Sequence, residues 1–294
     1  MTAAIVSAAQ KPRSAAIVSG LREFLKHPGA LCGTIVLAIF IICAIFAPWL
    51  APFDPSETDI GMRLGEPDAI TWFGADLHGR DIFSRVIWGA RYSLPVGFAT
   101  LIVGLIIGGT FGVMLGYIGG RFDAVCSRVI DVLLGFPSIV LAIMVVAVLG
   151  VGLVNVVVAV AIAEIPRFAR VIRGAVLVAK QNLYVEAALA MGASSTRVMF
   201  LHILPAIMPT VIVLGTLNLG NAILSTATLS FLGLGAQPPA PEWGAMLNSG
   251  REYMRYAPWT MIAPGLALFL AVIAVNLIGD RLSEVIDPRN ARRR

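Results

Sequence analysis

The stretch YVEAALAMGASSTRVMFLHILP, Tyr184–Pro205, lies between two long apolar runs, and the organisation of the rest of the chain follows from it. Its first part, Glu186–Ala190, has strong helix propensity. Gly192 can end such a helix in a left-handed conformation, because it has no Cβ to clash. Ser194 or Ser195 can then cap a second helix. The stretch therefore predicts a short helix, a turn and another short helix, and its charges make it too polar to cross a bilayer.

The composition around this stretch is that of a membrane protein. The chain has 294 residues, of which 58% are hydrophobic and 13% are charged, and its mean hydropathy is +0.86. A soluble domain has about 25% charged residues. Apolar segments long enough to span a bilayer are expected at 30–50, 94–118, 133–149, 153–171, 207–229 and 261–278. We therefore expect an all-α integral membrane protein with six transmembrane helices.

The positions of the basic residues predict how these spans are oriented. If the N-terminus is cytoplasmic, the inner segments and the adjoining Arg167 and Arg170 hold 16 of the 22 Lys and Arg residues. Those inner segments are 1–29, 119–132, 172–206 and 279–294. An excess of Lys and Arg on the cytoplasmic side is the general rule, so both termini and the Tyr184–Pro205 stretch are expected in the cytoplasm.

The net charge of +5 is explained by these basic cytoplasmic segments, so no nucleic-acid partner is expected.

The spans and loops divide the chain into four expected parts. These are a cytoplasmic segment with the first transmembrane helix at 1–52, an extracytoplasmic segment at 53–93, a five-helix core at 94–280 that includes the loop 180–205, and a basic cytoplasmic tail at 281–294. The extracytoplasmic segment is expected to contain a short interfacial helix from Arg80 to Tyr92. A long N-terminal region and a long apolar run favour an uncleaved first helix over a signal peptide.

Two patterns concern how the helices pack and where they meet the membrane surface. Glycine recurs at every fourth position from Gly104 to Gly120, which lets a neighbouring helix approach closely, so the second span is expected inside a bundle. Aromatic residues of the outer segment 230–260 are expected at the membrane interface: Trp243, Tyr253, Tyr256 and Trp259. A binding surface for an extracytoplasmic partner is the alternative for this segment.

Polar residues inside the spans are the candidates for a translocation path. They are Asn155, Glu164, Asn218, Asn221 and Ser225. The last three share one helical face. Interhelical hydrogen bonds are the alternative for the asparagines, and pairing with Arg167 or Arg170 is the alternative for Glu164.

The sequence offers no pattern for chemistry on this chain. The three cysteines have no paired spacing and the three histidines have no metal-ligand spacing, so no metal site is expected. The expected spans contain no histidine, which disfavours an intramembrane enzyme, and no catalytic residue is expected. The spans show no relay of buried acids, which disfavours a stand-alone secondary transporter. A GxxxxGK[ST] phosphate-binding loop is also missing, so the chain itself is not expected to hydrolyse ATP.

The Tyr184–Pro205 stretch resembles the EAA loop of binding-protein-dependent ABC importer permeases. Glu186-Ala187-Ala188, Gly192 and Ile203-Leu204-Pro205 carry the resemblance. It extends over nearly the whole chain, because FGAD, GRD, SR and GARYS within 73–93 and LSFLGLG, QPP and WG within 229–244 are similar to the dipeptide, oligopeptide and nickel branch. The overall shape fits the C-type permease subunit. Ala75 departs from the pattern, since that branch more often has threonine there.

The resemblance implies a type I ABC importer permease fold in the bacterial cytoplasmic (inner) membrane. The loop would form a coupling helix that docks on an ATP-binding subunit, through Glu186, Ala187, Ala188, Gly192, Ala193, Ser194, Arg197, Leu204 and Pro205. The implied partners are a second homologous permease, two ATP-binding subunits and an extracytoplasmic substrate-binding protein. ATP and Mg would be bound by partner subunits, and this chain would carry no cofactor. Dipeptides or oligopeptides are the implied cargo, with nickel, glutathione or opine-like solutes as alternatives.

Overall fold

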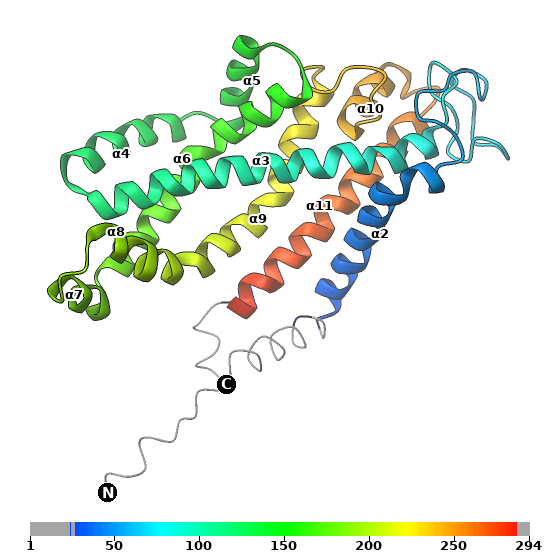
Figure 1. Cartoon of the computed structure of the whole chain (residues 1–294). Coiled ribbons are helices and arrows are strands. Elements are labelled where there is room, and N and C mark those ends of the chain that lie inside the picture. The colour runs from blue at the N-terminus through cyan, green and yellow to red at the C-terminus, as the bar shows by residue number, and fades with distance from the viewer. Residues whose placement is uncertain (1–23, 25–26, 287–294) are drawn as a thin grey trace, which may run out of the picture.

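The computed structural model describes residue 24 and residues 27–286, and these form a mainly helical molecule (Figure 1). The described residues contain no β-strand, only one isolated bridge between Ala75 and Asp81. Most of the expected inner segment 1–29 and of the basic tail 281–294 lies outside the described residues. The all-α expectation is confirmed.

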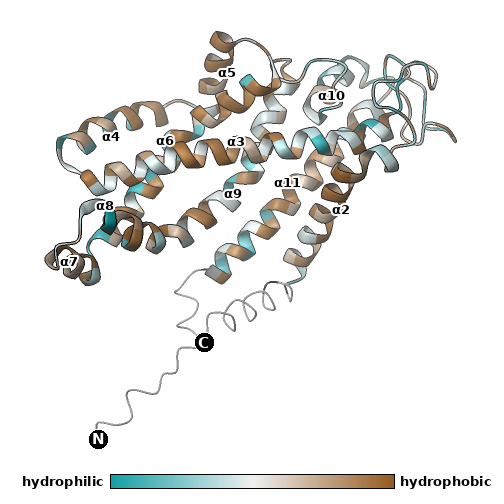
Figure 2. Ribbon diagram, in the orientation of Figure 1, coloured by the Kyte–Doolittle hydropathy of each residue, from teal (hydrophilic) through white to brown (hydrophobic). Residues whose placement is uncertain are grey.

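The elements follow in the order α2 (Pro28–Leu50), α3 (Ile82–Ile118), α4 (Gly120–Leu134), α5 (Ser138–Leu149), α6 (Leu153–Lys180), α7 (Leu183–Ala190), α8 (Ser195–Val198), the π-helical turn η1 (Met199–Ile203), α9 (Leu204–Phe231), α10 (Trp243–Gly250), the 3₁₀ turn η2 (Arg251–Tyr253) and α11 (Trp259–Ile286). Four helices among the described residues are long and apolar enough to cross a membrane: Pro28–Leu50, Ile82–Ile118, Ser195–Phe231 and Trp259–Val285. Figure 2 shows α2 hydrophobic along most of its length.

The expected third span at 133–149 is not a single helix. The chain breaks between α4 and α5, and the two helices are bent by 95° relative to each other. Pro137 is the N-cap of α5, and a proline disfavours helical backbone at the residue before it. With 12 residues, α5 alone covers only about 18 Å, short of the roughly 30 Å of a bilayer core. The helix α6, which contains the expected fourth span at 153–171, is not among the four candidates either. The described residues provide four spans, or five if the bent pair counts as one, and the number six remains a prediction.

The separate interfacial helix expected from Arg80 to Tyr92 is also not found. Asp81 caps the helix, because its carboxylate accepts a hydrogen bond from the backbone N–H of Ser84 at 2.8 Å. From Ile82 the helix then runs without a break past Pro95 to Ile118. Pro95 is tolerated inside α3, so the expected boundary at residue 93 has no counterpart in the helix.

The loops expected on one side of the membrane lie together. At one end, the ammonium group of Lys180 donates to the carbonyl of Tyr117 at 2.8 Å, which joins the ends of α6 and α3. At the other end, the N–H of Gly152 donates to the carbonyl of Leu234 at 3.0 Å. Figure 1 shows α7, the beginning of α2 and the end of α11 toward the lower side, and α10 with the segment 51–81 at the upper right. We call these the inner and outer ends; their cytoplasmic and extracytoplasmic assignment remains a prediction.

The glycine stripe packs against α6 from Gly104 to Gly116, which confirms the role expected of these residues. Gly120, the last glycine of the pattern, lies in α4, and a Cβ added there has nothing within 4 Å. A Cβ added at Gly108 would lie 2.8 Å from the carbonyl oxygen of Ile165, and one at Gly112 would lie 2.6 Å from that of Ala169. Gly116 is as close to Arg173 and Val176. The backbones therefore touch along this seam, and any side chain on α3 there would push the helices apart.

One aromatic residue expected at the membrane interface lies in the core instead. Trp243 is completely buried, and its indole N–H donates to the carbonyl of Val86 at 3.0 Å. The ring fills the space beside Gly89, where a Cβ would come within 2.3 Å of it. Tyr256, by contrast, is 75% exposed. The expected interfacial position is therefore wrong for Trp243, and it remains a prediction for Tyr253, Tyr256 and Trp259.

The same loop buries a carboxylate beside Trp243. Glu242 caps α10: its Oε1 accepts from the N–H of Gly244 at 2.9 Å and from the hydroxyl of Ser93 at 3.1 Å, and its Oε2 accepts from the N–H of Ala245 at 2.8 Å. Burial raises the pKa of this carboxyl above its ordinary value, while the amide hydrogen bonds act in the opposite direction. α10 is thereby fixed to α3.

Candidate functional site

The Tyr184–Pro205 stretch forms the helix–turn–helix that its residues predict. α7 ends at Ala190, and Gly192 has a φ of +83°, in the left-handed region. The N–H of Gly192 donates to the carbonyl of Leu189, and the N–H of Ala193 donates to that of Ala188, each at 3.0 Å. This pair of bonds is the Schellman motif, which satisfies carbonyls at the end of a helix. The predicted conformation of Gly192 is confirmed.

Ser194 caps the helix that follows, as predicted. Its hydroxyl accepts a hydrogen bond from the backbone N–H of Arg197 at 3.4 Å. The second helix is not a separate short piece, however, because Ser195–Phe231 is helical throughout. Leu204 and Pro205 therefore lie within a continuous helix rather than at a new beginning.

The expected helix–turn–helix does not include the π-helical turn that the structure has at Met199–Ile203. Pro205 lacks the N–H that would bond to the carbonyl of Leu201, and its ring would crowd that carbonyl. A wider turn just before the proline relieves this crowding. A proline eleven residues into a helix that begins at Ser195 was the available signal.

One side of α7 is anchored to the rest of the chain. Val185 is completely buried and Ala188 is 4% exposed. They pack in one cluster with Val198 of α8 and with Ile172 and Val176 of α6. Ala188 is thus part of the attachment of α7 to the molecule, whereas the resemblance implies that both Ala187 and Ala188 dock on an ATP-binding subunit.

The other side of α7 is free. Glu186, Ala187, Gly192, Ser194 and Arg197 are all exposed. Two large apolar residues flank them: Leu183 and Met191 are each 81% exposed. Water-exposed apolar side chains around small residues and one carboxylate are typical of a surface that another protein covers. The inner end therefore presents a rigidly held helix with one uncovered face.

The pathway candidates on α9 share a helix but not an environment. Asn218 is 4% exposed, and its amide donates to the carbonyl of Leu214 at 2.6 Å while its Oδ1 has no hydrogen-bond partner among the described residues. Asn221 is exposed and Ser225 is half-buried. Next to them, a Cβ at Gly220 would meet the side chain of Asn276 on α11. Asn221 is thus the member of this face that is open to its surroundings.

The two pathway candidates on α6 lie apart from each other. The amide of Asn155 donates to the carbonyls of Leu149 and Gly150 at 3.0 and 3.1 Å, so it holds the turn between α5 and α6. Glu164 lies 3.9 Å from Arg167, and its side chain is 13% exposed. Arg170, the other expected partner of Glu164, is instead paired with Asp131 of α4.

Two models of known protein families match the chain, one near its beginning and one over its larger remaining part. Residues 108–292 match the model of the binding-protein-dependent transport system inner membrane component. Residues 19–67 match the N-terminal transmembrane domain of oligopeptide transport permease C.

Known proteins resemble the chain over most of its length. The glutathione transport system permease protein GsiD of Pectobacterium atrosepticum is 47% identical over 91% of this chain and 89% of its own length. The dipeptide transport system permease protein DppC of Alkalihalophilus pseudofirmus is 45% identical over 91% of this chain and 88% of its own. A solved chain of the MetNI methionine ABC transporter, in an inward-facing form, has a TM-score of 0.57 at 21% identity and covers 69% of this chain and 96% of its own. This last likeness concerns the fold.

Proposed function

The chain belongs to the family of binding-protein-dependent transport system inner membrane components. We propose that an ATP-binding subunit docks on the exposed face of α7 and that the movement driven by ATP hydrolysis is passed to the chain there. The chain is a permease subunit of an ABC importer with the type I fold. In this proposal it forms the translocation pathway in a bacterial inner membrane together with a second homologous permease. Two ATP-binding subunits drive it, and an extracytoplasmic binding protein delivers the solute.

The observation that carries the proposal is the two-sided packing of α7. The side with Val185 and Ala188 is buried against α6 and α8, so a push on the helix reaches the membrane-spanning part directly. The side with Glu186 and Ala187 is uncovered. A helix that is fixed on one side and free on the other is suited to pass movement from a partner into the bundle.

The cargo proposed for this chain is a peptide-like solute. Its relatives are named for dipeptide and glutathione transport, and both solutes are small peptides with free carboxylates. Nickel or opine-like cargo is the alternative. Titration of the purified binding protein with a dipeptide, glutathione and Ni²⁺ tests the proposal: saturable binding of a peptide supports it, and binding of Ni²⁺ alone contradicts it.

The test of the coupling role reverses the charge of Glu186. In proteoliposomes holding the whole transporter, Glu186→Lys is expected to lower ATP-driven uptake by about tenfold or more, equivalent to about 1.4 kcal/mol of lost docking. The matched control is Glu66→Lys, the same change at an exposed residue of the outer end, which is expected to transport normally. Wild-type uptake by Glu186→Lys at equal permease content would refute the role. Uptake without the ATP-binding subunits would favour a stand-alone transporter.

A further inference from the structure

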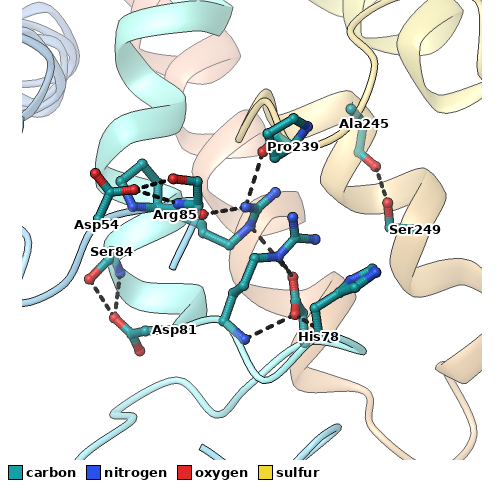
Figure 3. A network of polar contacts seen from close by, with 12 residues as sticks. Asp54, His78, Asp81, Ser84, Arg85, Pro239, Ala245 and Ser249 are labelled. Carbon is teal, nitrogen blue, oxygen red and sulfur yellow. Dashed lines mark hydrogen bonds and ion pairs between the residues drawn. The ribbon is translucent and has the colours of Figure 1, made fainter. Parts of the chain in front are cut away.

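The outer end contains a buried cluster of charged residues that the coupling mechanism does not use. Asp76 is ion-paired with both Arg80 and Arg85. Arg85 lies where the segment 51–81, α3 and the loop before α10 meet (Figure 3). The side chains of both arginines are nearly inaccessible, at 7% and 5% exposed, and that of Asp76 is 16% exposed. Charged groups this deeply buried require compensation.

Arg85 is held by backbone carbonyls. One terminal nitrogen donates to the carbonyl of Pro55 at 2.5 Å and to that of Pro239 at 3.2 Å. Its Nε lies 3.7 Å from the carboxylate of Asp76. Arg85 of α3 is thereby bound to Pro55 and to Pro239, which lie 30 and 154 residues away from it in the sequence (Figure 3).

Arg80 uses only part of its guanidinium group. Its Nε donates to Oδ2 of Asp76 at 2.7 Å. Among the described residues, no hydrogen bond or ion pair involves its two terminal nitrogens. These nitrogens carry the N–H donors that suit bidentate recognition of a carboxylate.

Two small cavities adjoin the cluster, and both arginines line each of them. One has a volume of about 120 Å³ and reaches between His78 and Tyr253. The other has a volume of about 100 Å³ and is bounded by Gln237 and Asn248. The first has space for about four water molecules, and the exposed His78 in its lining places it next to the outer surface.

The ion pairs around these cavities do not balance. Two guanidinium groups share one carboxylate, and Asp76 is the only acidic residue ion-paired to either arginine in the described part of the chain. The other buried carboxylate nearby, that of Asp81, accepts hydrogen bonds from Ser84 and forms an ion pair with neither arginine, so one guanidinium group has no carboxylate of its own. We propose that this pocket binds a carboxylate group, which supplies the missing partner and fits the free edge of the Arg80 guanidinium.

The occupant is a single carboxylate rather than a whole solute, because neither cavity could enclose a dipeptide. Two sources supply that chemistry at the outer end: the carboxylate of a peptide-like solute arriving for transport, and an acidic side chain of the binding protein that delivers it. Both sources rest on the proposed importer function, whereas the carboxylate pocket itself does not.

The experiment measures the thermal unfolding midpoint of the purified full chain in detergent against increasing potassium acetate, with ionic strength held constant by methanesulfonate. Saturating acetate is expected to raise the midpoint by about 2–4 °C, and acetamide is not. Arg80→Gln abolishes the effect, and Arg80→Lys retains a weaker one. Arg63→Gln, which removes an exposed arginine of the same segment, keeps the full effect.

A fourth variant is expected to gain acetate binding, which a mere loss of folding could not produce. Asp76→Asn removes the competing carboxylate, so it is expected to bind acetate more tightly than the wild type does. No saturable acetate effect in the wild type, or an equal effect in Arg80→Gln, would overturn the proposal. This measurement involves neither ATP nor uptake, so its failure is distinct from a failure of the importer function.

The wild type and Arg80→Gln also show whether the bound carboxylate comes from the solute or from the binding protein. A midpoint shift produced by dialanine but not by dialanine amide identifies the solute. If dialanine has no effect, a lower affinity of the purified binding protein for Arg80→Gln transporter than for wild type identifies the protein side chain. The absence of both effects would contradict a carboxylate site that serves transport.

Discussion

Gly192 is the residue on which the geometry of the inner end depends. Its positive φ lets the chain reverse between α7 and α8 while the amides of Gly192 and Ala193 close the end of α7. A Cβ built at this position has nothing within 4 Å. Space is therefore available for a side chain, and the backbone conformation alone demands glycine.

Because position 192 has space for a side chain but a backbone conformation that few residues tolerate, two substitutions there are expected to differ in effect. Gly192→Val places a β-branched residue in the left-handed region, which costs about 1–2 kcal/mol or more and is expected to uncouple ATP hydrolysis from uptake while the chain still inserts. Gly192→Asn, which tolerates that conformation, is expected to stay close to wild type. The ratio of solute taken up to ATP hydrolysed in proteoliposomes checks both, and equal behaviour of the two variants would contradict the argument.

Glu242 gives the outer end a dependence on pH. Its folded pKa lies above the ordinary value of 4.5, because burial disfavours the charged carboxylate. The folded chain then holds more protons than the unfolded chain above that value, so stability falls as the pH rises through the window between the two pKa values. Glu242→Gln cannot ionise, and its thermal midpoint is expected to be flatter over that window than that of the wild type. Parallel curves would show that Glu242 is not the group responsible.

Among the helices, the pairing of α3 with α6 determines how the two ends are connected. α6 carries the hydrophobic anchors of α7 at its inner end, and α3 carries Arg85 at its outer end. Their backbones touch along the glycine stripe. A movement of α7 is therefore expected to be passed to α3 through this seam rather than absorbed by flexible side chains.

The close packing of α3 against α6 can be tested by substituting a glycine in the contact, with a glycine of α6 outside the contact as the matched control. A Cβ at Gly112 lies 2.6 Å from the carbonyl of Ala169, whereas one at Gly174 of α6 has nothing within 4 Å. Gly112→Leu is expected to destabilise the chain by about 1–3 kcal/mol or more, and Gly174→Leu to be neutral or stabilising because glycine is a poor helix former. Size-exclusion profiles and thermal midpoints in detergent measure both. Equal midpoints would mean that the seam is not tightly packed.

For the whole molecule, the fold separates two surfaces with different chemistry. The inner end exposes a helix with apolar and small residues, and the outer end encloses a guanidinium pocket within folded loops. Between them the helices carry exposed apolar side chains such as Ile35, Ile39 and Ile45 of α2, which suit contact with lipid. This arrangement fits an importer that receives solute at one end and mechanical work at the other.

Local patterns in the sequence predicted the features that depend on neighbouring residues. The helix–Gly192–Ser194 turn and the α3 glycine stripe were both readable, because conformational preference and spacing determine them directly. The break before α5 was not predicted, because the hydrophobicity of the segment 133–149 does not reveal the turn at Pro137. Buried Trp243 and the Arg80 pocket depend on contacts between residues more than 100 positions apart, which no local pattern contains.

The most direct test of the coupling proposal compares two adjacent residues of α7. Ala187 is exposed and Ala188 is 4% exposed, so cysteines at the two positions differ only in the direction they face. In a chain whose three native cysteines are replaced by alanine, and assembled with its ATP-binding subunits, Ala187→Cys is expected to cross-link to a cysteine introduced on the ATP-binding subunit, and Ala188→Cys is not. Cross-linking of Ala188→Cys without Ala187→Cys, or of neither, would contradict docking through the exposed face of α7.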